Sequence, residues 1–200
     1  FGTPRHGKVY VWPTWVSGLI AGDKQCAWSA WFKAHFQYQK RPQENENALA
    51  TWKAAHDDMV AERYAALDTD GWDVAVEGQN KFSMKGKAAV LGGAPDLVAV
   101  RRGVLRIEDC KSGKERDGDF WQVCIYLLAV PLARPELAAL EPTGAVVYRD
   151  RIREIDQAAF WLAKDRIANY ITQVGTGPEP ARTPSASECR FCDIAACPDR

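Results

Sequence analysis

The sequence predicts an α/β (α+β) fold in which a mixed central β-sheet is flanked by helices. Two observations lead to this prediction. Segments with helical spacing of apolar residues lie at both ends of the chain, and short β-type segments separated by glycine turns lie between them. Helices that carry one apolar face cover such a sheet and bury its residues.

The first part of the chain, residues 12–67, is predicted to be helical. Residues 23–40 form an aromatic-rich helix, and core packing is the favoured use of its aromatic rings over stacking on bases (Trp28, Trp31, Phe32, Phe36). Residues 45–67 form a second helix. Its apolar positions recur at helical spacing: Leu49, Trp52, Ala55, Met59, Ala61 and Ala65.

The central part, residues 72–173, carries the predicted sheet. Five strands are expected at Trp72–Val76, Lys81–Met84, Ala88–Leu91, Leu97–Val100 and Val104–Cys110. A helix follows over 118–132, with Asp117 or Asp119 as its N-cap. Strands at Ala145–Tyr148 and Ile152–Ile155 and a helix over 156–173 complete this part. The helix has one apolar face: Phe160, Ala163, Ile167, Tyr170, Ile171 and Val174.

Length and composition predict one domain spanning residues 1–200, which ends in a linker and a cysteine-rich segment over 175–200. Hydrophobic residues make up 46% of the 200, and 26 basic residues balance 26 acidic ones. This balance excludes a uniformly basic surface but allows a local basic groove. No apolar stretch is long enough for a membrane span, and we expect a cytoplasmic protein. Because Phe1 is not an initiator, we expect further residues upstream.

Two carboxylates and a lysine form an acidic centre in the predicted sheet. Asp96 begins one strand, and Asp109 and Lys111 lie on the next. Because strand side chains alternate, Asp109 and Lys111 share a face, whereas Glu108 and Cys110 take the other. Paired carboxylates suit Mg²⁺ or Mn²⁺, and a nearby lysine can stabilise charge on a phosphate. These three residues alone fit ordinary strand-end charges equally well.

A helical motif follows this strand closely. Gln122 and Tyr126 are four residues apart, so they lie on one face of the 118–132 helix. Taken alone, this spacing also fits an ordinary amphipathic helix.

The segments GAPDLVAV, IEDCKSGK and QVCIY together resemble the RecB-like branch of the PD-(D/E)XK nuclease superfamily. The resemblance implies a restriction-endonuclease-like core whose Asp96 and Asp109 bind metal and whose Lys111 is catalytic. It also implies that Gln122 and Tyr126 hold the site or the DNA strand. In this branch a histidine on an upstream helix is often a further ligand, which His56 matches. Glu77 is a further acid ahead of the strands, for which a role outside the site is favoured.

The cysteines predict a second metal site. Cys189, Cys192 and Cys197 have ligand spacing, and a fourth ligand must come from Cys26, Cys110 or Cys124. The last two lie in apolar surroundings, so Cys26 is favoured. The arrangement resembles iron-sulfur members of the superfamily, among them CRISPR-associated RecB-like exonucleases and AddB-type nucleases. It implies a 4Fe-4S cluster that joins the two ends of the chain, and Zn²⁺ remains the alternative.

The resemblance implies a metal-dependent exonuclease on single-stranded DNA ends, in repair, recombination or CRISPR adaptation. The resemblance implies a helicase or a CRISPR integrase as protein partner. Any unwinding would need a partner, because the chain has no phosphate-binding loop of its own. The alternative is a non-catalytic DNA-binding module with a cysteine-bound structural metal. Basic residues that could line a groove surround the acids: Lys81, Lys85, Lys87, Arg101, Arg102, Arg106, Lys114, Arg116, Arg149, Arg151 and Arg153.

Overall fold

The computed structural model describes residues 2–5, 7–42 and 46–199. The helices are α1 (Pro13–Ala21), α2 (Ala27–His35), α3 (Glu46–Thr69), α4 (Asp117–Ala133), η1 (Pro135–Leu137), α5 (Gln157–Thr176) and α6 (Ala186–Phe191). The strands are β1 (Thr3–Pro4), β2 (Tyr10–Val11), β3 (Phe36–Gln37), β4 (Asp73–Val76), β5 (Phe82–Lys85), β6 (Val90–Gly93), β7 (Leu97–Arg101), β8 (Val104–Lys111), β9 (Glu141–Tyr148) and β10 (Ile152–Glu154).

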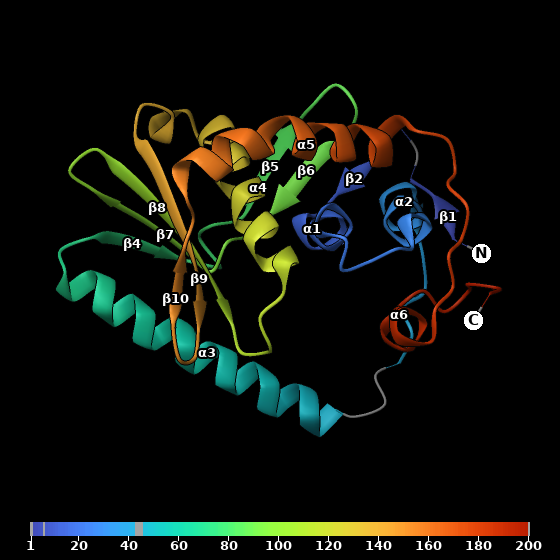
Figure 1. Cartoon of the computed structure of the whole chain (residues 1–200), viewed down its shortest axis with the longest axis horizontal. Coiled ribbons are helices and arrows are strands. Elements are labelled where there is room, and N and C mark those ends of the chain that lie inside the picture. The colour runs from blue at the N-terminus through green and yellow to red at the C-terminus, as the bar shows by residue number, and fades with distance from the viewer. Residues whose placement is uncertain (1, 6, 43–45, 200) are drawn as a thin grey trace.

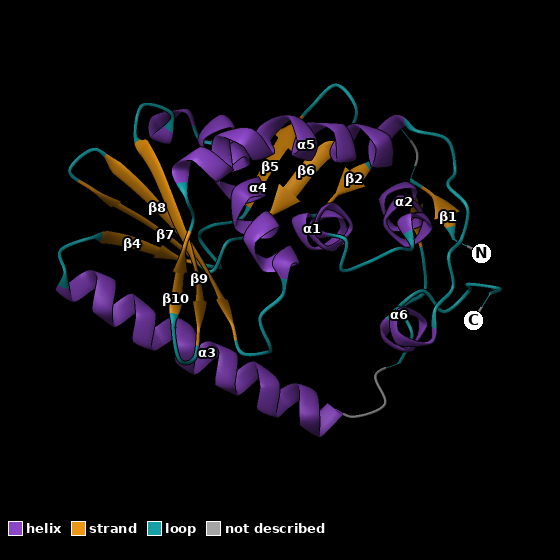
Figure 2. Cartoon of the chain, in the orientation of Figure 1, coloured by secondary structure: helices purple, strands orange, loops and turns teal. Residues whose placement is uncertain are grey.

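A five-stranded mixed sheet forms the centre, in the order β10-β9-β8-β7-β4. Strands β8 and β9 run parallel, and the other neighbouring pairs are antiparallel. Helix α3 lies along one face of this sheet and α4 covers the other (Figures 1 and 2). The predicted mixed sheet flanked by helices is confirmed.

The two faces of β8 bury different side chains because its residues alternate. Leu105 and Ile107 join the larger apolar cluster beneath α4, together with Val123 and Leu127. Cys110 lies on the other face, in a smaller cluster that includes Met59 and Leu67 of α3. This alternation directs successive side chains of the strand to opposite helices.

A second, three-stranded sheet in the order β2-β6-β5 lies beside the first, and α1 packs against α4. A close approach of two backbones makes this helix contact possible. A Cβ atom on Gly118 would lie 3.2 Å from the Cα atom of Gly18 and 3.0 Å from Oδ2 of Asp23. The same Asp23 carboxylate accepts a 2.7 Å hydrogen bond from the Gly118 amide, which anchors the start of α4.

The predicted 23–40 helix is wrong in its bounds. The structure has a short helix, α2, and then the extended residues Phe36 and Gln37, which pair with β1. Phe36 and Gln37 pair with Pro4 and Thr3 as an antiparallel strand, so the chain leaves the helix after His35. Helix α1, which precedes this region, lies within the predicted helical part over residues 12–67, although no separate helix was expected at its position.

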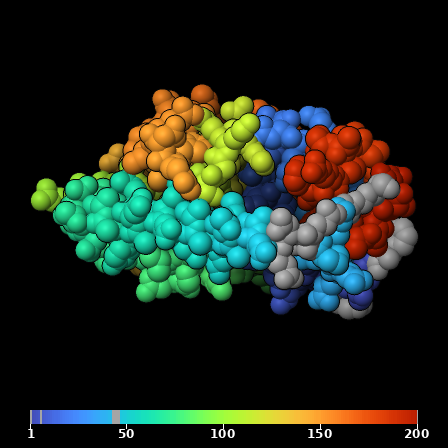
Figure 3. Space-filling model, turned by 90° about the horizontal axis from the view of Figure 1, so that it is seen from below, coloured from blue at the N-terminus to red at the C-terminus, as the bar shows by residue number. Residues whose placement is uncertain are grey.

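The predicted apolar face of α3 is right at Met59 and wrong over the N-terminal turns. Leu49 and Trp52 are 43% and 52% exposed, while Met59 and Leu67 are buried. The sheet covers only the C-terminal part of this long helix, and Figure 3 shows α3 lying across the outside of the molecule. The N-terminal turns of α3 therefore leave apolar side chains in solvent.

The N-cap of α4 is Arg116 and neither of the predicted aspartates. Asp119 instead occupies the third helical position, where its carboxylate accepts a 3.0 Å hydrogen bond from the Arg116 amide. This is the reciprocal half of a capping box, which satisfies a backbone donor at the helix start.

None of the helices in the described residues is both long and apolar enough to cross a membrane.

Candidate active site

The end of β8 and the start of α4 bring three of the predicted site residues into contact. Lys111 forms an ion pair with Oδ2 of Asp109, as strand alternation predicts for these positions. The amide of Gln122 donates a 3.0 Å hydrogen bond to Oδ1 of Asp109 and accepts a 3.1 Å bond from Lys111 Nζ. Gln122 therefore fixes the carboxylate and the ammonium group relative to each other.

Tyr126 lies behind this group on the next turn of α4. Its hydroxyl accepts a 3.2 Å hydrogen bond from Gln122 Nε2 and lies 3.5 Å from the carbonyl oxygen of Ala94. Gly93 makes room for the ring, since a Cβ atom there would come within 2.9 Å of Tyr126 Cε1. Burial raises the pKa of Tyr126, so its hydroxyl stays protonated and serves as a fixed polar contact.

Asp96 lies on the loop before β7 and faces the same centre. Its Oδ2 atom accepts a 2.6 Å hydrogen bond from the Cys110 amide and lies 3.3 Å from Nε2 of His56. His56 comes from α3, forty residues earlier in the chain. The structure thus places all six predicted residues of this site in one region: His56, Asp96, Asp109, Lys111, Gln122 and Tyr126.

Burial decides the charge states of the centre. Asp109 is 2% exposed, and burial raises the pKa of its carboxyl group to about 6, although Lys111 opposes this shift and the nearby Asp96 adds to it. Burial lowers the pKa of Lys111, but the ion pair with Asp109 outweighs it and leaves the pKa raised. The hydrogen bond to Asp96 raises the pKa of His56. Lys111 therefore stays charged beside Asp109, and the contact with Asp96 favours the protonated imidazole of His56.

The chemistry of the donor set fits a hard divalent cation. Two carboxylates and one imidazole converge here, and Oδ2 of Asp109 contacts Lys111 without accepting a directed hydrogen bond. Within residues 2–5, 7–42 and 46–199, however, no three His, Cys, Asp or Glu side chains form a ready-made metal site. A divalent cation here could be held by the carboxylates of Asp96 and Asp109 and by the imidazole of His56, which lies 3.3 Å from Asp96.

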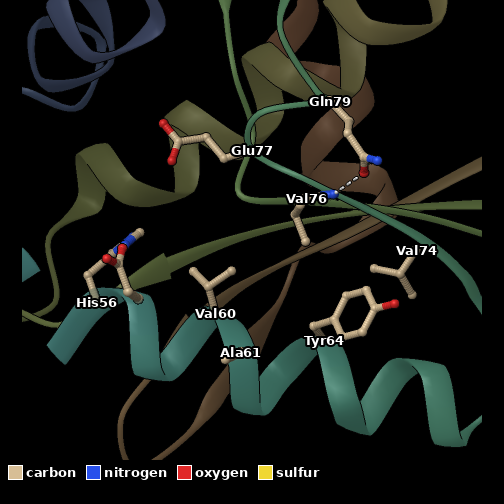
Figure 4. Close-up of a pocket in the computed structure, with 9 residues that line it drawn as sticks. His56, Val60, Ala61, Tyr64, Val74, Val76, Glu77 and Gln79 are labelled. Atoms are coloured by element: carbon tan, nitrogen blue, oxygen red, sulfur yellow. Dashed lines mark hydrogen bonds and ion pairs between the residues drawn. The ribbon is translucent and has the colours of Figure 1, made fainter. Parts of the chain in front are cut away.

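A pocket of about 500 Å³ opens beside His56, between α3 and the region of β4 (Figure 4). Val60, Ala61 and Tyr64 form its wall on α3, and Val74 and Val76 lie opposite. Glu77, which the sequence placed outside the site, lines this pocket across from His56. The walls of the pocket are apolar, and its end beside His56 carries acidic side chains. This end lies next to Asp96 and Asp109, which together with His56, Lys111, Gln122 and Tyr126 we call the carboxylate centre.

Trp52 is a residue of this region that sequence reasoning assigned to the core. Its indole ring stacks on the imidazole of His56, with ring centroids 5.6 Å apart and an interplanar angle of 26°. The spacing of four residues between Trp52 and His56 on one helix was the signal that could have shown this pairing.

Several predicted groove residues are engaged elsewhere. Arg106 pairs with Glu108 and Glu154, on the α3 face of the sheet, and Arg151 and Arg153 pair with Glu115. These ion pairs place three arginines against acids of the protein itself.

The predicted cluster cysteines lie in one region at the ends of the chain. Cys26, Cys192 and Cys197 pack on an apolar cluster of Trp28, Phe32 and Ile194. The carboxylate of Glu188 accepts hydrogen bonds from the amides of Gln25 and Cys26, which joins α6 to the start of α2. Cys189 lies on α6, next to Glu188. All four are half-buried free thiols, whereas Cys110 and Cys124 are buried.

Comparisons with known proteins place the chain in a family. No protein with a curated description matches the chain. The crystal structure of SSO0001 is similar with a TM-score of 0.45 and 18% identity, covering 96% of this chain and 87% of that one. The family model described as the PD-(D/E)XK nuclease superfamily matches residues 19–198. With its β8 acid-x-lysine strand inside that match, the chain belongs to the PD-(D/E)XK nuclease superfamily.

Proposed function

We propose that the chain is a metal-dependent deoxyribonuclease that removes nucleotides from single-stranded DNA ends. Membership of the superfamily implies a nuclease, which hydrolyses phosphodiester bonds. The observation that carries the proposal is the contact network of Asp109, Lys111 and Gln122, which holds a carboxylate and an ammonium group side by side in a buried centre.

In this proposal His56, Asp96 and Asp109 hold the divalent ion, Mg²⁺ or Mn²⁺. A bound ion of this kind would polarise a phosphoryl oxygen and lower the pKa of a coordinated water. Lys111 holds the attacking water or the developing phosphate charge, because its ammonium group lies beside Asp109. Gln122 orients both groups, and Tyr126 orients Gln122.

A single strand is the proposed substrate because the site offers surfaces for unpaired bases. Trp52 is 52% exposed, and one face of its ring is already held by His56. The neighbouring pocket is lined by aliphatic side chains and Tyr64. A base can stack on the free face of the indole only when it is not paired within a duplex.

The four half-buried cysteines support a role as ligands of one cluster. We assign Cys26, Cys189, Cys192 and Cys197 to a 4Fe-4S cluster, with Zn²⁺ as the alternative, and place the chain in the RecB-like branch. Glu188 and the Trp28 cluster already join the two segments that carry these thiols. The cluster would then fix the C-terminal segment to α2 and leave the chemistry to the carboxylate centre.

The same proposal treats the chain as one domain over residues 1–200, with 12–67, 72–173 and 175–200 as its parts. Its place is DNA repair, recombination or CRISPR adaptation, beside a helicase or an integrase that supplies the free end. A DNA-binding module without catalysis is the second function, and intact DNA binding without cleavage would favour it.

The test uses protein purified without oxygen and end-labelled single-stranded DNA, with Mn²⁺ or with a chelator. We expect cleavage only with the metal, and loss of cleavage in Asp109→Ala. Equal cleavage by Asp109→Ala would remove the carboxylate centre from the reaction, and DNA binding without any cleavage would support the binding module.

A further inference from the structure

A second pocket, which shares no residue with the carboxylate centre, lies at the N-terminal end of α1. Its volume is about 540 Å³, within the usual range for small-molecule sites. Residues from three separate segments line it, among them Arg5, Trp12, Trp15, Tyr38 and Lys40. We call it the Trp12 pocket.

The lining of the Trp12 pocket is positively charged. It includes Arg5 and Lys40 and has no acidic side chain among the described residues. Neither cation has an ion-pair partner within the described part of the chain, and the buried Nε of Arg5 has no hydrogen-bond acceptor there. Asp193 contacts the lining through Tyr38, from which it accepts a hydrogen bond, and it forms an ion pair with Lys33. The cations are therefore available to an anion.

Aromatic side chains lie beside these cations. Trp12 is 42% exposed, although an indole of this size is usually covered, and Trp15 is only partly buried against the core. Trp12 also precedes the first turn of α1 without a capping hydrogen bond, and no acid lies in that turn. The helix terminus adds positive potential to that of the two side chains.

Two unpaired cations next to an exposed indole match the chemistry of a nucleotide, which carries a phosphate and an aromatic base. We propose that the Trp12 pocket binds one nucleotide of a single DNA strand, with the phosphate against Arg5 and Lys40 and the base on Trp12. The inference rests on DNA as the proposed substrate, but it does not require cleavage. It adds a strand-binding site apart from the residues that hold the metal.

The experiment measures binding of a fluorescent single-stranded oligonucleotide by anisotropy, without divalent metal, in an Asp109→Ala background. Arg5→Gln/Lys40→Gln is expected to weaken binding on the order of tenfold at 0.1 M salt. Two lost phosphate contacts would also reduce the slope of log K against log salt by about 1.4. Trp12→Ala is expected to weaken binding about tenfold and to leave the slope unchanged, because stacking releases no counterions.

The matched control, Lys164→Gln/Arg190→Gln, removes one lysine and one arginine from exposed positions outside the pocket. Arg5→Lys/Lys40→Arg keeps both charges and is expected to retain the salt slope, which separates charge loss from misfolding. An equal loss of oligonucleotide affinity in the Gln control and in the pocket variant would overturn the inference. So would displacement of the oligonucleotide by a mononucleotide at equal concentration, which would assign the pocket to free nucleotides. If the parent protein binds the oligonucleotide through the pocket but does not cleave DNA, the nuclease proposal is refuted and this one stands.

Discussion

Lys111 on β8 donates a 3.1 Å hydrogen bond from Nζ to Oε1 of Gln122 on α4. The other end of the same amide donates to Asp109, so one side chain sets the separation of the two charged groups. Gln122 is 6% exposed and has no alternative partner in water. A reaction that depends on this separation must therefore depend on Gln122.

Replacing Gln122 with leucine should slow cleavage by about a hundredfold, because small displacements of reacting groups cost factors of this size. Leucine preserves the volume but neither donates to Asp109 nor accepts from Lys111. We expect kcat to fall while the Kd for single-stranded DNA changes less than about threefold, since binding relies on many other contacts. Single-turnover cleavage and anisotropy measure the two quantities.

Gln173→Leu on α5 is the control, because Gln173 is exposed and lies outside the site. An unchanged kcat in Gln122→Leu would show that the amide does not position Asp109 and Lys111.

Glu108 should matter for stability and little for the reaction. Its side chain is 1% exposed and lies on the α3 face, where Arg63 donates bonds of 2.6 and 2.8 Å to it. Glu108→Ala leaves Arg63 and Arg106 without this buried anion, and breaking a buried pair costs about 3–5 kcal/mol. Urea unfolding should show this loss, while cleavage per folded molecule stays near the parent value.

Glu154→Ala is the comparison, because the Glu154 side chain is 61% exposed and also pairs with Arg106. An exposed pair contributes about 0–1 kcal/mol. An equal loss of unfolding free energy in Glu108→Ala and Glu154→Ala would contradict a special role for the buried carboxylate.

Strand alternation is what made the acidic centre predictable. The period of two assigned Asp109 and Lys111 to one side of β8 and Glu108 and Cys110 to the other, and the contacts follow that division. The apolar face of α5 was predictable from helical spacing, and Phe160, Ala163, Ile167 and Val174 are buried there. Local periodicity determines these features.

Features that depend on distant packing were not predictable. Helix α1 is held by the close approach of Gly18 to Gly118, which no local pattern reveals. The exposed end of α3 follows from the length of the sheet beneath it, so apolar spacing at Leu49 and Trp52 gave the wrong face. The pairing of Phe36 with Pro4 likewise joins segments that are far apart in sequence.

Removing the Trp52 ring should raise KM for single-stranded DNA more than KM for duplex DNA. Trp52→Ala deletes the indole that stacks on His56, and each stacked base contributes about 1–3 kcal/mol. We expect KM for single-stranded DNA to rise about tenfold or more, with little change for blunt duplex DNA. Steady-state cleavage of the two substrates tests this difference.

Trp161→Ala provides the matched control, since Trp161 is 55% exposed on α5, away from the site. Trp52→Phe should recover part of the affinity because it retains a ring. Equal changes for both substrates would indicate damage to His56 instead of a lost stacking surface.

The six cysteines should divide into two classes by reactivity. Burial raises the pKa of Cys124 to about 12 and raises that of Cys110 as well, so at pH 8 only about one Cys124 thiol in ten thousand is ionised. The predicted cluster cysteines are only half-buried, so a reagent can reach all four, although burial raises the pKa of Cys192 as well. In folded protein stripped of metal, we expect four thiols to react quickly with a thiol reagent and two to react only after denaturation.

The anaerobic, untreated protein supplies the decisive comparison, because thiolates that bind iron or zinc are protected from the reagent. We expect the four fast thiols to become slow in it and an iron-sulfur absorbance to be present. Cys192→Ala should lose the absorbance and the protection of the other three together, since a cluster needs four ligands. Protection with zinc and no absorbance would favour Zn²⁺, and fast reaction of all four in untreated protein would contradict a metal centre here.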